Sequence, residues 1–292
     1  MPLRTLKEET TDSLMLRWVL HVQNYNLTLD KNRCVGCQIC SLACPKEAIK
    51  LQKQPKKTGE KTRKAKVDVD LTKCNFCGIC DITCPYGAIK VASTGKQVLK
   101  VLEKESFPEM IRDIQIDESK VSTRSLRAKD PCPLNLITIT HSHPSSKPQI
   151  EVDKEHCPCC TVCETKLPGI MHVRKMLNGR ISIHTEKCPE GCTDCLDVCP
   201  ITGALYLSSQ DQKVYPNESF CVYCGACKAV CPVDEALELK RTHIHHKPVR
   251  SGAWNKTLER LTSSVEMTKE LKTKGSMRAR ESVKKRVGLK EE

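Results

Sequence analysis

Groups of closely spaced cysteines constrain this chain more than any other feature of its sequence. Two of the groups repeat the spacing C-x2-C-x2-C-x3-C-P, and they consist of Cys34, Cys37, Cys40, Cys44 and of Cys74, Cys77, Cys80, Cys84. A third copy consists of Cys221, Cys224, Cys227, Cys231, and a fourth, with one extra residue after its first cysteine, of Cys188, Cys192, Cys195, Cys199. The chain has 21 cysteines but only 3% aromatic residues. Apolar burial alone is therefore a poor candidate for what holds it together.

Disulfide bonds are one use for so many cysteines, but the N-terminus argues against export. The first residues, MPLRTLKEETTDS, are acidic where a signal peptide is basic and then apolar. The segment SLMLRWVLHV that follows is too short for a membrane span and contains an arginine. The sequence therefore predicts a cytoplasmic protein with reduced thiols and no membrane span, in which grouped thiolates bind metal.

The spacing of the cysteines favours iron–sulfur clusters over zinc. In the run C-x2-C-x2-C-x3-C-P, three thiolates bind one [4Fe-4S] cube and the fourth binds the cube of a partner run. A zinc site has no use for a third closely spaced cysteine or for a terminal Cys-Pro. Four sites are expected on this basis, and their ligands are Cys34, Cys37, Cys40 with Cys84; Cys74, Cys77, Cys80 with Cys44; Cys188, Cys192, Cys195 with Cys231; and Cys221, Cys224, Cys227 with Cys199.

A fifth site is predicted in the middle of the chain, where two incomplete runs complement each other. Cys157, Cys160 and Cys163 have the correct spacing, but Leu167-Pro168 replaces the fourth cysteine. Upstream, Cys132-Pro133 remains, while the three preceding ligand positions are Ser122, Ser125 and Ala128. A pair of runs that loses one cube loses the first three cysteines of one run and the fourth cysteine of the other, and these are the four cysteines that are absent here. The four that remain, Cys157, Cys160, Cys163 and Cys132, form one complete site. Two alternatives stay open: Cys132 as a small buried hydrophobic residue, and Cys159 as the ligand in place of Cys160.

Short apolar segments flank each cysteine run and predict the fold. NLTLDK, VDVDLTK, IQIDESK, IEVDKE, ISIHTEK and KVYPNE precede the runs, whereas AIKLQ, AIKVA, LITIT, IMHVRK, ALYLS and ALELK follow them. Each half then consists of a strand, a cluster loop, a short helix and a strand, and two halves form one domain with pseudo-twofold symmetry. The expected division is a docking segment at 1–27, domains at 28–106, 107–180 and 181–242 with two, one and two clusters, and a basic helical tail at 243–292.

Residues 28–241 resemble three tandem bacterial-type 2[4Fe-4S] ferredoxin domains, that is, a polyferredoxin. The layout is similar to the polyferredoxin subunit of archaeal formylmethanofuran dehydrogenase and to those of hydrogenase and heterodisulfide reductase complexes. The resemblance implies an α+β fold, five [4Fe-4S] clusters, and a subunit that passes low-potential electrons between the oxidoreductases of an anaerobic complex. A zinc or nucleic-acid binding module built on cysteine knuckles is the distant alternative.

No motif for catalysis accompanies the cysteines. The chain has no nucleotide-binding G-x-G-x-x-G that opens a helix and no convincing pair of nucleophile and base. Four thiolates on a cube leave no iron open to a substrate, so an enzyme is not expected. Gly36, Gly78 and Gly225 lie inside cluster loops, where the backbone is expected to approach sulfur closely.

The charge balance argues against nucleic acid as a partner. The formal net charge is +13, but five oxidised cubes with four thiolates each would contribute about −10 and leave about +3. The lysine-rich segment QKQPKKTGEKTRKAK is expected to be a solvated insertion between strands.

The two ends of the chain are not ferredoxin-like. An apolar stripe of Trp254, Leu258, Leu261 and Val265 predicts a helix that ends near Gly275 and docks on other subunits of a redox complex, with packing on its own core as the alternative. The segment SLMLRWVLHV is expected to dock in the same way. Five histidines in two short segments are expected to be exposed linker residues rather than metal ligands; they are His141, His143, His243, His245 and His246.

Overall fold

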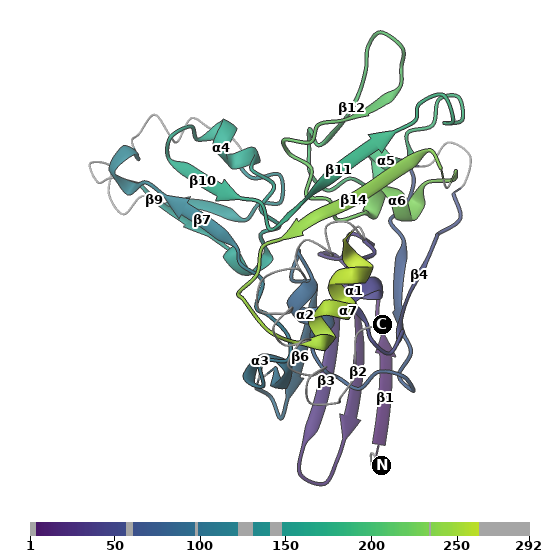
Figure 1. Cartoon of the computed structure of the whole chain (residues 1–292), viewed down its shortest axis with the longest axis vertical. Helices are drawn as coiled ribbons and strands as arrows, with labels where there is room; N and C mark the ends of the chain where they lie inside the picture. Colours follow the sequence, from purple (N-terminus) through teal and green to yellow (C-terminus); the bar gives the residue numbers. More distant parts are fainter. Residues whose placement is uncertain are drawn as a thin grey trace, which may run out of the picture.

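Three small units, each built from short strands and helices, make up the computed structural model (Figure 1). The structure describes residues 4–56, 61–96, 99–121, 131–140, 148–233 and 235–262. All twelve of the strands predicted around the cysteine runs are present. The α+β, ferredoxin-type fold is therefore confirmed.

The first unit contains the longest sheet. Its elements are β1 (Arg4–Glu9), β2 (Ser13–Val19), β3 (Asn24–Asp30), α1 (Ile39–Ala43), β4 (Ile49–Gln52), β5 (Lys66–Val69), α2 (Ile79–Thr83), β6 (Ile89–Ser93) and α3 (Lys100–Glu103). The strands form a four-stranded sheet in the order β1-β2-β3-β6 and a separate antiparallel pair β4-β5. The outer strand pair of the ferredoxin-like part, β3 with β6, is thus extended by an N-terminal hairpin.

The other two units repeat the same antiparallel pairing. The middle unit consists of β7 (Asp113–Ile116), a 3-10 turn (Glu118–Lys120), β8 (Ile137–Thr140), β9 (Gln149–Val152), a 3-10 turn (Lys154–His156), α4 (Val162–Lys166) and β10 (Met171–Arg174). The third consists of β11 (Leu177–Ile183), α5 (Asp194–Asp197), β12 (Leu205–Leu207), β13 (Val214–Pro216), α6 (Ala226–Val230) and β14 (Leu237–Ile244). In both, the first strand pairs with the last and the two inner strands pair with each other.

The short helices overlap the cysteine runs, whereas the sequence predicts that they follow the cluster loops. Each of α1, α2, α4, α5 and α6 contains the third cysteine of its run and ends at or just before the fourth position. In α1, α2 and α6 that position is a cysteine with a non-helical backbone, and the proline that follows cannot continue the helix. The Cys-Pro pair therefore ends each of these three helices.

The N-terminal segment belongs to the fold of the first unit and is not a separate docking element. Leu14 and Leu16 on β2 are fully buried against the chain's own core. The boundaries expected after residues 27, 180 and 242 also fall inside β3, β11 and β14. Strand pairing, which the sequence pattern does not reveal, places the whole of β3 in the first unit and the whole of β11 and β14 in the third.

The C-terminal helix α7 (Gly252–Leu261) packs on the chain itself, so the prediction that its apolar stripe docks a partner is wrong for the described residues. Trp254, Leu258 and Leu261 are all buried. The Trp254 ring makes edge contacts with Phe107 at 5.1 Å and with His246 at 4.7 Å between centroids. Val265, and the expected end of the helix near Gly275, lie outside the described residues.

Each of the three units touches the other two, and α7 packs on α1 of the first unit. Figure 1 shows the first unit below, with the middle and third units as two lobes above it. Lys56 of the first unit forms an ion pair of 2.6 Å with Asp194 of the third, and Thr62 binds the same carboxylate. The described part of the lysine-rich insertion is thus a link between units and not merely a solvated loop.

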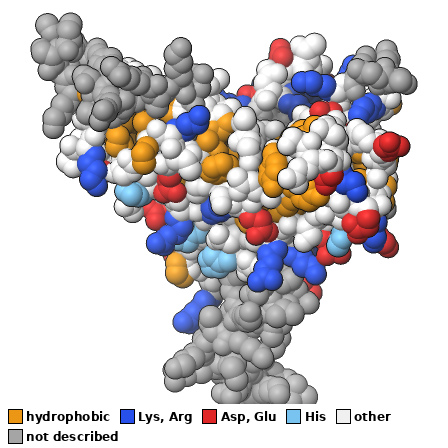
Figure 2. Space-filling view, turned by 90° about the horizontal axis from the view of Figure 1, so that it is seen from above, with side chains coloured by type: hydrophobic (Ala, Val, Ile, Leu, Met, Phe, Trp, Pro, Cys, Tyr) orange, Lys and Arg blue, Asp and Glu red, His pale blue; other side chains and the backbone are white. Residues whose placement is uncertain are grey.

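Charged side chains of both signs are interspersed over the face seen from above (Figure 2). Hydrophobic side chains are visible between them on the same face. The basic side chains behind the formal net charge of +13 therefore do not form a single continuous stripe on this face.

Candidate metal centres

The cysteines gather into five sets, each with the membership predicted from the spacing. Four sets line pockets: Cys34, Cys37, Cys40 and Cys84; Cys132, Cys157, Cys160 and Cys163; Cys188, Cys192, Cys195 and Cys231; and Cys199, Cys221, Cys224 and Cys227. In the fifth set, burial raises the pKa of Cys74 to about 11, and the nearby thiolates of Cys77 and Cys44 add to this effect, as they do for Cys80. The exchange of the fourth cysteine between halves is thus present in the first and third units.

The same backbone turn shapes all five loops. The residue immediately before the second cysteine has a positive φ in each loop: Gly36 (69°), Phe76 (53°), Cys159 (59°), Gly191 (65°) and Tyr223 (51°). The left-handed conformation curls the loop so that successive thiols face one side. At Gly36 a Cβ atom would lie 2.5 Å from the carbonyl oxygen of Ala65, so this glycine is required by close approach of backbone.

Backbone amides point at several of the sulfur atoms. The amide of Ala48 donates to Cys44 Sγ and that of Ala88 to Cys84 Sγ, both at 3.3 Å. The amide of Tyr223 lies 3.4 Å from Cys221 Sγ. Donors of this kind stabilise a thiolate and tune a bound cluster.

Cys132 lies where the complementary-loss argument places it. It is buried and lines the same pocket as Cys157, Cys160 and Cys163. Burial raises the pKa of Cys160 to about 11, and the thiolates of Cys157 and Cys132 add to this effect. Leu167, at the position of the absent fourth cysteine, is 1% exposed and belongs to the core. Ser122, Ser125 and Ala128 lie outside the described residues.

Cys159 has a different role from its neighbours. It is fully buried, does not line the pocket, and occupies the left-handed position that Gly36 or Tyr223 holds elsewhere. Its Sγ lies 3.8 Å from the carbonyl oxygen of Cys157. A hydrogen bond from its thiol lowers the pKa of Cys157 to about 7, and the same contact together with burial raises the pKa of Cys159.

The set around Cys188 is the most open. All four of its cysteines are partly exposed, whereas three of the four are buried in the set around Cys37 and two of the four in the set around Cys80. The extra residue enlarges the loop at Gly191, which has open space around it. The four thiols of this set are therefore less shielded from solvent than those of the other sets.

The histidines outside the runs do not gather into a metal site within the described part of the chain. His243 is the penultimate residue of β14, its ring lies 6.4 Å from that of His245, and His246 packs on Trp254. His243 is exposed as predicted, but it belongs to a strand and not to a linker, while His245 and His246 are half-buried. His141 and His143 lie outside the described residues.

Comparison with known proteins agrees with the cysteine geometry. The family model for the 4Fe-4S dicluster domain matches residues 33–88 and 179–235. A chain of the formate dehydrogenase, heterodisulfide reductase and formylmethanofuran dehydrogenase complex from Methanospirillum hungatei superposes with a TM-score of 0.77 at 28% identity, over 90% of this chain and 92% of that chain. The chain is a polyferredoxin-like protein. No curated protein matches it in sequence.

The chemistry of the donor sets in this polyferredoxin-like protein fits [4Fe-4S] clusters. All 21 cysteines are free thiols, and burial raises the pKa of most of them, including Cys195 and Cys199 to about 12. Deprotonating such buried thiols is costly unless a metal compensates the charge. Within the described residues, no three Cys, His, Asp or Glu side chains form a site for a single metal ion.

One buried hydroxyl also lacks a partner until such a group is considered. Tyr86, two residues after Cys84, is buried, and its hydroxyl makes no hydrogen bond within ordinary limits. Burial first, and then the nearby Cys224 thiolate, raise the pKa of Tyr86, with Cys37 and Cys199 close behind. A sulfur acceptor at this position would satisfy the hydroxyl, which places Tyr86 between a first-unit set and a third-unit set.

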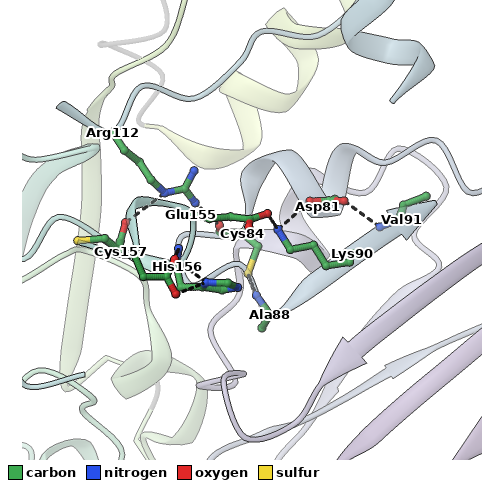
Figure 3. A network of polar contacts seen from close by, with 10 residues as sticks. Asp81, Cys84, Ala88, Lys90, Val91, Arg112, Glu155, His156 and Cys157 are labelled. Atoms are coloured by element: carbon green, nitrogen blue, oxygen red, sulfur yellow. Dashed lines mark hydrogen bonds and ion pairs between the residues drawn. The ribbon is translucent and has the colours of Figure 1, made fainter. Parts of the chain in front are cut away.

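Arginine and lysine side chains join the sets across unit boundaries, a feature that the sequence interpretation missed. Arg112 donates from Nε to the carbonyl of Cys157 at 3.1 Å and from Nη2 to the carbonyl of Cys84 at 2.9 Å, and so bridges the middle and first units (Figure 3). Lys90 and Glu155 form an ion pair across the same boundary. Lys53 donates to the carbonyl of Cys231 at 2.6 Å, which joins the first unit to the third.

None of the helices in the described ranges is long and apolar enough to cross a membrane.

Proposed function

We propose that this polyferredoxin-like protein is an electron-transfer subunit with five [4Fe-4S] clusters, one on each cysteine set. The observation that carries the proposal is the convergence of four cysteines from two chain segments at each of five places. The ligands are Cys34, Cys37, Cys40, Cys84; Cys44, Cys74, Cys77, Cys80; Cys132, Cys157, Cys160, Cys163; Cys188, Cys192, Cys195, Cys231; and Cys199, Cys221, Cys224, Cys227.

One-electron transfer is the chemistry that a cluster with four cysteine ligands supplies. The chain's part is to hold the thiolates in place, to exclude water from the buried sets, and to keep neighbouring sets close. Cys37 and Cys224 are near each other, because the thiolate of Cys224 adds to the burial that raises the pKa of Cys37. This proximity supports passage of electrons from unit to unit, and no substrate site is needed for that role.

We further propose that the protein works inside a large oxidoreductase complex in the reducing cytoplasm. The support is its likeness, over nearly the whole of both chains, to a chain of a complex whose title joins formate dehydrogenase, heterodisulfide reductase and formylmethanofuran dehydrogenase. The partners would be the other subunits of such a complex. The buried residues of α7 are not the docking residues, and the open set around Cys188 is a better candidate for the port to a partner.

Iron and acid-labile sulfide in the anaerobically purified chain test the cluster proposal. We expect about 20 of each per chain, with brown absorption that bleaches on reduction. A colourless protein with bound zinc would refute the proposal. Purification from native cells under the same conditions tests the complex, because an electron-transfer subunit should bring redox enzymes with it.

A further inference from the structure

Arg241, on β14, is a buried cation between two cysteine sets. Its residue is 5% exposed, and it lies on the same face of the strand as Leu237 and Leu239. Nε donates to the carbonyl of Tyr223 at 2.8 Å and Nη2 donates to the carbonyl of Cys224 at 2.7 Å. Nη1 lies 3.5 Å from the carbonyl oxygen of Leu261 at the end of α7. Among the described residues, each hydrogen-bond partner of the guanidinium is thus a neutral carbonyl.

A buried guanidinium without a carboxylate is costly, so its charge requires an explanation. Burying an ion costs several kcal/mol in proteins, as an order of magnitude, unless an opposite charge is close. The anions that offset the burial of Arg241 are, in order, the thiolates of Cys37, Cys224, Cys227 and Cys221. Three of these belong to the third-unit set that includes Cys199, and Cys37 belongs to the first-unit set that includes Cys84.

A purely structural role does not need the charge. A neutral donor such as a glutamine could bind the carbonyls of Tyr223 and Cys224 at a far smaller desolvation cost. Lys240, the residue before Arg241 in the same strand, points the other way and pairs with Glu238 at the surface, with 69% of its side chain exposed. The chain therefore places one of two adjacent cations in solvent and the other where it faces the two thiolate sets.

We propose that Arg241 is the counter-charge shared by the Cys37 and Cys224 sets and that it raises the reduction potentials of the clusters there. This inference rests on the proposed function. Each electron added to a cluster with four thiolates increases its negative charge, and two such sites face each other across the boundary between the units. A cation held between them in a low-dielectric interior favours the reduced form of both, whereas a solvated cation does so weakly. Clusters on the Cys37 and Cys224 sets are thereby easier to reduce than clusters on the other three sets.

Redox titration of the anaerobically purified full chain, followed by electron paramagnetic resonance, tests the inference. Arg241→Gln keeps hydrogen-bond donors and removes the charge, Arg241→Lys keeps the charge, and Lys240→Gln removes the same charge from the exposed neighbour. We expect Arg241→Gln to shift at least one reduction wave to more negative potential by a tenfold change in equilibrium, about 59 mV for one electron. The lysine variant should stay close to wild type, and Lys240→Gln should shift little. The affected wave should be one that is altered in a Cys227→Ser variant.

Each outcome decides between a counter-charge and a clamp. Unchanged waves in an Arg241→Gln variant with wild-type iron content would overturn the inference. If Arg241→Gln loses iron, Arg241→Lys decides: retention of all clusters at wild-type potentials supports the counter-charge, and an equal loss means that Arg241 is only structural. Failure of the proposed function itself would be visible earlier, as missing iron or missing reduction waves in the wild-type chain.

Discussion

Single residues at matching positions of the five loops show how similar sites are built from different side chains. Glycine, phenylalanine, tyrosine and cysteine all occupy the left-handed position before the second cysteine. A non-glycine residue pays a conformational cost there, which burial of Phe76, Tyr223 and Cys159 helps to offset. The extra cysteine of the middle loop is therefore explained by backbone shape and packing without a fifth ligand.

Cys132 and Cys159 provide a matched pair of variants in the middle unit. Cys132→Ala should remove about four irons per chain or convert the cluster to a three-iron form, because the pocket loses one of its four thiolates. Cys159→Ala should leave the iron content unchanged, since its sulfur does not line that pocket. Iron analysis of both proteins is the measurement, and the reverse pattern would show that Cys159 is the ligand and Cys132 is not.

The grouping of thiols could be predicted from the sequence because cysteine spacing is itself a geometric constraint. The residues that surround the thiols could not, because they come from distant segments. Arg112 contacts Cys84 and Cys157, and Tyr86 approaches Cys224, only once separate units pack together. Arg241 left one signal: it occupies an inward position in the alternation of Leu237, Leu239 and Arg241, where a buried charge calls for a partner.

Among the elements, α7 is the one whose role changes most between sequence and structure. An amphipathic helix near the end of a chain has an apolar face that either the chain itself or a partner can cover, and periodicity alone does not distinguish the two. Here Ser251 caps the helix and donates to the carbonyl of Ser106, while Arg260 donates to the carbonyl of Cys44. These contacts fix α7 across the first unit.

Trp254→Ala should cost about 3–5 kcal/mol in the free energy of unfolding, because it removes a large buried side chain and leaves a cavity against Phe107. Tyr206→Ala is the control, since this aromatic residue on β12 is 50% exposed. Chemical denaturation of both variants with their clusters bound is the measurement. If the two variants lose equal stability, α7 does not pack as described.

At the scale of the whole molecule, one core runs through all three units, and the cysteines are part of it. Buried residues of the first, middle and third units form a single cluster that includes thiols from four of the five sets, and Cys195 and Cys231 of the remaining set pack against it. With only 3% aromatic residues, much of the interior around these thiols has little else to fill it. The bound metal is thus expected to act as a structural element of each unit.

Removal of iron by a chelator under oxidising conditions should therefore unfold most of the chain, and not merely abolish its colour. We expect loss of β-sheet signal in circular dichroism and loss of hydrogen-exchange protection in the middle and third units. The sheet β1-β2-β3-β6 should retain the most protection, because Leu14, Leu16, Leu27 and Leu29 supply an apolar face without thiols. A chain that keeps its full secondary structure without iron would contradict this expectation.

The middle unit has Leu167 where its second site would have a fourth thiol, and the set that it keeps faces Arg112 and the other two units. If the three units lay in a straight row, a cluster missing from the middle unit would interrupt the proposed electron transfer between the two outer units. Here the Cys224 thiolate lies near Cys37, so the proposed electron transfer between the first and third units need not pass through the middle unit. The proposed electron transfer between the first and third units therefore does not depend on a second cluster in the middle unit.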